Sequence, residues 1–254
     1  MLITDKRQPA NAQRFRDACE KILSAERAKT GIGTFGEKSL HAILKLYFEP
    51  DKTKHEITVG SFIADIVADG AVIEIQTRSF DKLRKKLIEL LEIYPVTVVY
   101  PIPKTKWISW IDAQTGETTK KRKSPKQGKI YDAIFELYKI KSFLNHHNFR
   151  LCLVLLNMEE YRCLNGWSDD KKKGSTRYDR VPVDIVEEVY FCSVSDYQQL
   201  LPEGLQYEFT SKDYQKMSKT SLRTAQTALN ILYNIGVVRR IGKRGNLHVY
   251  ELAG

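Results

Sequence analysis

The sequence of 254 residues predicts an α/β protein with a mixed central sheet flanked by helices, followed by a small C-terminal α+β unit. Two observations lead to this fold class. Between residues 11 and 160, helical patterns alternate with short apolar strand patterns, which is typical of α/β folds. Beyond residue 196 the pattern changes to two helices and an alternating strand pair. We therefore predict two domains, residues 1–190 and residues 191–254.

The elements of the first part follow from the spacing of apolar residues. Recurrence every three or four residues predicts helices over 11–29, from Glu37 to Tyr47, over 79–93 and over 129–144. Apolar runs predict strands over 55–59, 96–100 and 149–156, and a further strand or linker over 183–194. A hairpin is predicted over 106–119. The glycine-rich segment 30–36 predicts a connector rather than a phosphate-binding loop, because no Gly-Lys-Ser/Thr follows it.

A tight hairpin over residues 62–76 organises this part of the chain. Two apolar runs flank Asp69-Gly70, a dipeptide that favours a two-residue turn because both positions tolerate a positive φ. The turn fixes a register in which Asp65 faces Glu74, and Gln76 lies on the same face. The other members of this face are apolar: Ile63, Val67 and Val72. Opposed carboxylates repel, so a half-buried pair of this kind requires a cation.

The spacing of Asp65, Glu74 and Gln76, with Glu37 in the preceding helix and a helix after the hairpin, resembles the PD-(D/E)XK nuclease superfamily, the restriction endonuclease-like fold. The resemblance covers roughly residues 30–101. It implies that Asp65, Glu74 and the carbonyl of Ile75 bind Mg²⁺, or alternatively Mn²⁺, and that Glu37 and Gln76 complete the catalytic site. Gln76 departs from the family pattern, because a neutral amide cannot replace the cationic lysine. Glu37 also suits the positive end of a helix dipole, so both roles stay open.

The helix predicted over 79–93 supplies positive charge next to this site. Its inward side is expected to be apolar: Leu83, Leu87, Ile88, Leu90 and Leu91. Its outer side carries Lys82, Arg84, Lys85 and Lys86, which either hold phosphates beside the scissile bond or form a solvated face. A second basic segment, residues 118–129, holds six cations and no acid. Beside Trp107 and Trp110 it either clamps a phosphate backbone or forms a solvated loop.

Residues 196–254 resemble a winged helix-turn-helix domain. A short helix, a turn and a longer helix precede two alternating strands that flank the basic turn 242–246. The resemblance implies that the longer helix enters the major groove of DNA and that the wing contacts the backbone. The residues so implied are Ser221, Arg223, Thr224, Gln226 and Thr227 in the helix, and Arg239, Arg240, Lys243 and Arg244 in the wing. Winged helices also serve as dimerisation or protein-binding modules, so that alternative stays open.

Composition limits the class of partner and the compartment. Forty-one basic and 31 acidic residues give a net charge of +10, which favours a polyanionic partner. No apolar run approaches the roughly 18 residues of a membrane span, and the N-terminus lacks the apolar core of a signal peptide. We therefore expect a cytoplasmic protein without membrane contact. The four scattered cysteines predict neither a disulfide framework nor a zinc site.

Together these features lead to the expectation of a Mg²⁺-dependent endonuclease that hydrolyses phosphodiester bonds in duplex DNA, with a sequence-specific, restriction-type enzyme as one form. Cutting both strands at a symmetric site would favour a homodimer. The first alternative is a non-catalytic DNA-binding regulator with a degenerate nuclease fold, which Gln76 favours. The second alternative is a nuclease that acts on branched DNA or RNA.

Overall fold

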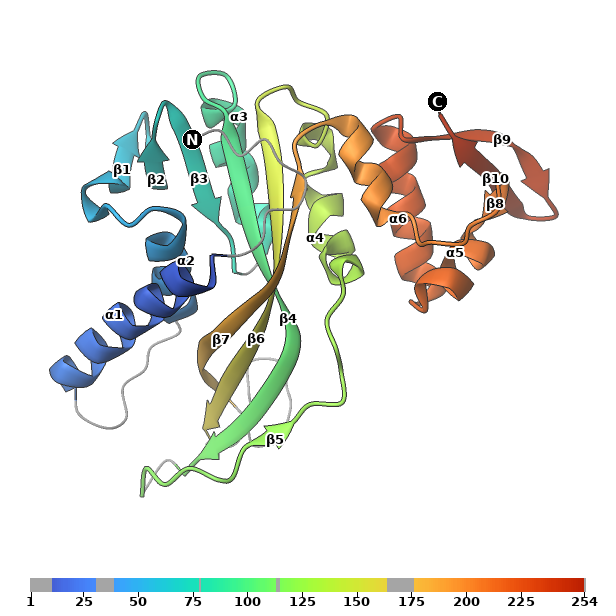
Figure 1. The fold of residues 1–254 in the computed structure, drawn as a ribbon. Coiled ribbons are helices and arrows are strands. Elements are labelled where there is room, and N and C mark those ends of the chain that lie inside the picture. The colour runs from blue at the N-terminus through green and yellow to red at the C-terminus, as the bar shows by residue number, and fades with distance from the viewer. Residues whose placement is uncertain (1–10, 31–38, 78, 113–114, 164–175, 254) are drawn as a thin grey trace.

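The computed structural model describes residues 11–30, 39–77, 79–112, 115–163 and 176–253 (Figure 1). Within this part the chain has an α/β fold whose mixed central sheet is flanked by helices, and a smaller sheet packs with helices at the C-terminal end. The predicted fold class is thus confirmed at this level. No helix in the described ranges is long and apolar enough to cross a membrane.

The central sheet of the described chain has the strand order β1-β2-β3-β4-β6-β7, with β5 paired to β4. The first three strands form an antiparallel meander, β3-β4 and β4-β6 are parallel pairs, and β6-β7 is antiparallel. The strands are β1 (His55–Val59), β2 (Phe62–Ala68), β3 (Ala71–Ile75), β4 (Val96–Ile111), β5 (Arg122–Lys123), β6 (Phe149–Cys163) and β7 (Thr176–Phe191).

Helices cover both faces of this sheet. On one face, α1 (Ala12–Thr30) and α2 (Ser39–Phe48) bury Leu40, Ile43 and Leu44 against the strands. On the other face lie α3 (Leu83–Leu90) and α4 (Ile134–Lys139), with 3₁₀ turns around them. Burial of each large apolar side chain stabilises the fold by roughly 1.5–3 kcal/mol. The remaining short helices are η1 (Lys52–Lys54), η2 (Phe80–Lys82), η3 (Ile130–Ala133) and η4 (Lys141–Phe143).

The hairpin turn and its register are confirmed. Asp69 and Gly70 have φ values of 51° and 74°, as a two-residue hairpin turn with two left-handed positions requires. The register pairs Ala68 with Ala71, Val67 with Val72 and Ile66 with Ile73. The ladder stops there, so Asp65 and Glu74 are not a strand pair as predicted. The prediction that Ile63 shares a half-buried face is also wrong, because Ile63 is 61% exposed.

Two segments differ from their predicted form. The strand predicted over 96–100 continues as β4 through Pro101 and Pro103 to Ile111. β3 ends at Ile75, the partner of Val99, so β4 has an open edge beyond this point, where proline is tolerated. The helix predicted over 129–144 is broken into η3, α4 and η4, because Ile140 leaves the helical conformation with φ −117° and ψ 20°.

The C-terminal unit begins after β7 and contains a three-stranded sheet of order β8-β10-β9. Its helix starts are capped: Thr210 and Asp213 form a capping box before α5, and the side chain of Ser221 caps α6. Buried residues of α4 and α6 belong to one continuous cluster, which includes Leu137 and Leu232. The elements are η5 (Val194–Leu200), β8 (Phe209–Thr210), α5 (Ser211–Ser218), α6 (Leu222–Asn234), β9 (Val238–Arg244) and β10 (Leu247–Leu252).

Candidate active site

An open pocket of about 240 Å³ lies where β2 and β3 separate. It is lined by His41, Asp65, Glu74, Ile75, Gln76, Lys82, Leu83 and Lys86. The fold therefore brings together four residues of the predicted site, from the hairpin, and adds side chains from α2, η2 and α3. Glu37, the fifth predicted residue, lies outside the described residues.

Asp65 is held by the neighbouring strand and by α2. Oδ2 of Asp65 accepts a hydrogen bond from the backbone N–H of Ile75 at 2.8 Å and lies 3.2 Å from Nε2 of His41. The backbone N–H of Asp65 in turn donates to Oε1 of Glu74 at 3.2 Å. These side-chain hydrogen bonds replace the backbone pairing of β2 and β3, which ends at Ile66 and Ile73. Burial alone would raise the pKa of Asp65, but His41 and the N–H of Ile75 hold it below its ordinary value, so Asp65 is ionised.

Glu74 is the group with the most unusual electrostatics in the pocket. Its side chain is only 6% exposed, and its Oε2 accepts a hydrogen bond from Nζ of Lys86 at 2.7 Å. Burial and the charge of Asp65 raise the pKa of Glu74 to about 7, although Lys86 opposes the shift. The pocket thus combines two carboxylates, Asp65 and Glu74, with two lysines, Lys82 and Lys86, and with His41.

Lys86 is the site residue that sequence reasoning misplaced. It was predicted on the outer side of its helix, yet its side chain is 15% exposed and also donates to the carbonyl of Ile63. Ile88, predicted to point inward, is 58% exposed instead. The spacing contained the signal: Lys86 follows Leu83 by three residues and precedes Leu90 by four, so the three share one side of the helix.

The donor set suits a divalent cation, although it is small. Within the described ranges, no three His, Cys, Asp or Glu side chains form a metal-binding group. Mg²⁺, however, is often bound by one or two carboxylates together with water and phosphate oxygens. Asp65 and Glu74 provide two such carboxylates in one open pocket, and because burial and the charge of Asp65 raise the pKa of Glu74, a bound cation would favour its ionised form. These residues fit Mg²⁺ or Mn²⁺.

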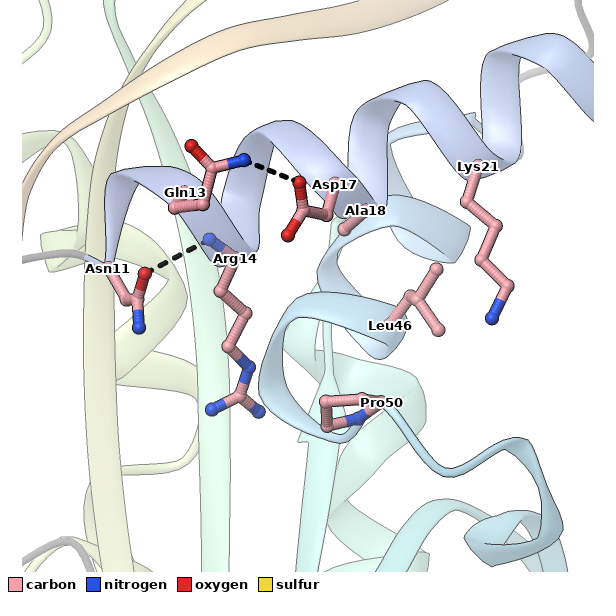
Figure 2. Close-up of a pocket in the computed structure, with 8 residues that line it drawn as sticks. All are labelled: Asn11, Gln13, Arg14, Asp17, Ala18, Lys21, Leu46 and Pro50. Atoms are coloured by element: carbon pink, nitrogen blue, oxygen red, sulfur yellow. Dashed lines mark hydrogen bonds between the residues drawn. The ribbon is translucent and has the colours of Figure 1, made fainter.

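A larger pocket of about 350 Å³ lies between α1 and the end of α2, and Figure 2 shows the residues that line it. Several of its polar side chains form hydrogen bonds within α1 or between α1 and α2. Asn11 caps α1 by accepting a hydrogen bond from the N–H of Arg14 at 3.0 Å, and Gln13 donates to Asp17 at 2.7 Å. The guanidinium of Arg14 donates to the carbonyl of Phe48 at 2.5 Å. This pocket contains none of the predicted site residues.

The predicted DNA-reading residues of α6 have structural contacts. Oγ of Ser221 accepts a hydrogen bond from the N–H of Thr224 at 3.0 Å, which caps the helix and leaves Thr224 buried. The side chain of Thr227 donates to the carbonyl of Arg223 at 2.8 Å. Gln226 is exposed. The guanidinium of Arg223 lies over the ring of Phe135, on α4, at 5.2 Å from its centroid.

One side of α6 therefore faces α4. Asn230, one turn beyond the predicted residues, accepts a hydrogen bond from Lys141 at 3.2 Å, and apolar residues of α6 share a buried cluster with α4. A helix held in this way presents only part of its polar surface to a groove of DNA. Insertion of α6 into the major groove stays a prediction.

The wing residues divide into two groups. Arg239 forms an ion pair with Glu251 at 2.5 Å, and Arg240 lies over the ring of Tyr233 at 4.3 Å from its centroid. Lys243 and Arg244 lie exposed at the tip of the β9-β10 hairpin. The tip is thus the part of the predicted DNA-binding set that projects most freely into solvent.

The fold and the pocket define an α/β protein with a carboxylate pair on a β-hairpin. Residues 38–192, more than half of the chain, match a family described as a domain of unknown function, DUF8091, and the chain belongs to this family. The matched range contains the described pocket and the whole central sheet. An uncharacterized protein of Treponema pallidum (strain Nichols) is 29% identical over 228 residues, which cover 87% of each chain. No solved structure matches the chain.

Proposed function

We propose that this protein is a Mg²⁺-dependent DNA endonuclease with a restriction endonuclease-like domain and a C-terminal winged helix. One observation carries the proposal: Asp65 and Glu74 meet where β2 and β3 separate, with Lys86 in contact with Glu74. The helix before the hairpin, the hairpin and the helix after it occur as α2, β2-β3 and α3, in the order that the resemblance requires. The helix-turn-helix and the basic hairpin of the C-terminal unit support the second part.

Each side chain of the pocket has a role in this proposal. Asp65 is kept ionised as a metal ligand, and Glu74 becomes a second ligand when its proton is displaced. When bound, Mg²⁺ would polarise a phosphate oxygen and lower the pKa of a bound water. Lys86 supplies the cation that Gln76 lacks and can hold a phosphate oxygen or a proton. The amide of Gln76 can donate a hydrogen bond to a phosphate oxygen or orient the attacking water.

A second candidate function is a DNA-binding regulator without catalysis. It is favoured by the ion pair between Lys86 and Glu74, because this contact already neutralises one carboxylate, and by the neutral Gln76. In this case the carboxylates would be structural, with His41 and the N–H of Ile75 as the partners of Asp65. The two functions make opposite predictions for cleavage.

The test is cleavage of supercoiled plasmid by the full chain in Mg²⁺, Mn²⁺ or EDTA. We expect nicking or linearisation that requires the metal and falls at least about 100-fold in Asp65→Asn, Glu74→Gln and Lys86→Met. Two matched controls on exposed positions, Lys52→Met and Glu92→Gln, should cut like the wild type. Cleavage that persists in EDTA or in Asp65→Asn would contradict the proposal. DNA binding without cleavage would establish the regulator instead.

A further inference from the structure

The distal half of the central sheet carries an unusual concentration of positive charge. Beyond Thr105, β4 continues with β5, β6 and β7 as an arm, defined here as residues 106–111, 122–123, 159–163 and 177–180. In Figure 1 the lower ends of these strands extend past the helices that cover the rest of the sheet. The arm therefore presents two faces, which the strand register assigns.

One face of the arm is strongly basic. Paired residues point to the same side of a sheet, and the register aligns Ile108 with Arg122 and Glu160, and Trp110 with Arg162. On β7, Arg180 pairs with Glu160 and Arg177 pairs with Arg162. Within these paired strands, this face, which we call the basic face, holds five cations and one acid, Glu160. The five cations are Lys106, Arg122, Arg162, Arg177 and Arg180.

Glu160, the single acid of the basic face, forms ion pairs with three of its cations. Glu160 is 2% exposed and lies 2.9 Å from Lys106, 2.5 Å from Arg162 and 3.7 Å from Arg177. Burial alone would raise the pKa of Glu160, but Lys106 and Arg162 hold it below its ordinary value, so one negative charge is shared by three cations. The partners remain 22–44% exposed, which leaves N–H donors for an external anion. On the opposite face, Lys121 pairs with Glu159.

The basic face begins beside the carboxylate pocket. The guanidinium of Arg180 donates to the carbonyl of Thr77 at 3.3 Å, and Thr77 follows the pocket residue Gln76 directly. From Arg180 the positive charge continues through the partners of Glu160 to Arg122 on β5. Arg180 itself is buried, at 8% exposure, so Arg122, Arg162 and Arg177 provide the accessible guanidinium groups of this face.

We propose that the basic face binds the phosphate backbone of DNA on one side of the carboxylate pocket, through Arg122, Arg162 and Arg177. The identity of the polyanion rests on the proposed function. The five-to-one charge ratio on this face, the exposed guanidinium groups and the continuity with the pocket all favour a long phosphate backbone over a single small anion.

The experiment measures binding of a short fluorescein-labelled DNA duplex to the full chain in EDTA, by anisotropy at several salt concentrations. Arg122→Gln/Arg177→Gln removes two exposed cations, so folding should be unaffected, which thermal melting checks. We expect Kd to rise about tenfold and the slope of log K against log salt to fall by about 2. The charge-matched control is Lys21→Gln/Lys52→Gln, on exposed positions of α1 and η1, and it should bind like the wild type.

The outcomes separate this inference from the nuclease proposal. In one outcome, the wild type cuts DNA in Mg²⁺ and Arg122→Gln/Arg177→Gln has an unchanged Kd and salt slope. This result would refute DNA binding by the basic face and would leave the nuclease proposal in place. In another outcome, the wild type binds duplex DNA without cutting it and Arg122→Gln/Arg177→Gln binds more weakly. This result would support DNA binding by the basic face and would contradict the nuclease proposal. Absence of duplex binding by the wild type would overturn the inference outright.

Discussion

Ionisation of Glu74 provides the most direct test of the pocket's electrostatics. Burial and Asp65 raise the pKa of Glu74 from 4.5 to about 7 in the folded protein. The folded state therefore binds this proton more tightly than the unfolded state does, and the free energy of unfolding falls as pH rises from about 4.5 to about 7. Above that range the loss is complete. The difference corresponds to about 3 kcal/mol, and the side chain is buried deeply enough for little of it to be screened by solvent.

Glu74→Gln/Lys86→Met removes this titration together with the ammonium that would otherwise be left unpaired. We expect the stability of the variant to decline less than that of the wild type between about pH 5 and about pH 8, by about 3 kcal/mol. For a chain of this length that corresponds to a relative shift of roughly 5–10 °C in Tm. Thermal melting in EDTA at both pH values measures it. Other groups with shifted pKa values, such as Glu188, are present in both proteins and cancel in the comparison.

Saturating Mg²⁺ supplies the second half of this test. At about pH 8 the cation should raise the Tm of the wild type, because it binds the ionised pair, and should leave the variant unchanged. Equal pH dependence of the two proteins would show that Glu74 does not titrate as the geometry indicates. If the wild type gains no stability from Mg²⁺ or Mn²⁺, metal binding in the pocket is excluded.

Two further predictions concern the wing and the support of β4. Lys243→Gln/Arg244→Gln, at the wing tip, should weaken binding of duplex DNA and lower its salt slope by about 2, and unchanged anisotropy titrations would exclude the wing. Gly128→Ala should lower the stability by about 1–3 kcal/mol in chemical denaturation, because an added Cβ would lie 2.2 Å from the carbonyl oxygen of Pro103. Gly242→Ala, where an added Cβ meets nothing within 4 Å, is its control and should melt like the wild type.

The sequence predicts the hairpin well because its determinants are local. Asp69-Gly70 sets both the turn and the register, so the proximity of Asp65 and Glu74 follows from nine residues of chain. The turn does not determine where the ladder ends. The strands separate beyond Ile66 because side-chain hydrogen bonds of Asp65 and Glu74 replace backbone pairing, and strand periodicity contains no information about that exchange.

Tertiary packing accounts for the other differences. The length of β4 depends on its pairing with β6, which continues from Val96 to Ile111 through Pro101 and Pro103. The contact of Arg223 with Phe135 depends on how α6 packs against α4, nearly 90 residues away in the chain. Neither the pairing of β4 with β6 nor the contact between Arg223 and Phe135 can be recognised from the spacing of residues in the sequence.

Lys86 shows how closely the pocket depends on that packing. Its ammonium contacts Glu74 and the carbonyl of Ile63, so a residue of α3 ties together the two strands of the hairpin at the point where they separate. The position of α3 is in turn fixed by Leu87 and Leu90, which are buried against the sheet. A rotation of α3 would withdraw Lys86 and leave two carboxylates without their cation. The charge of the pocket is therefore set by the hydrophobic face of a helix, and a substitution there changes the site without touching a residue that lines it.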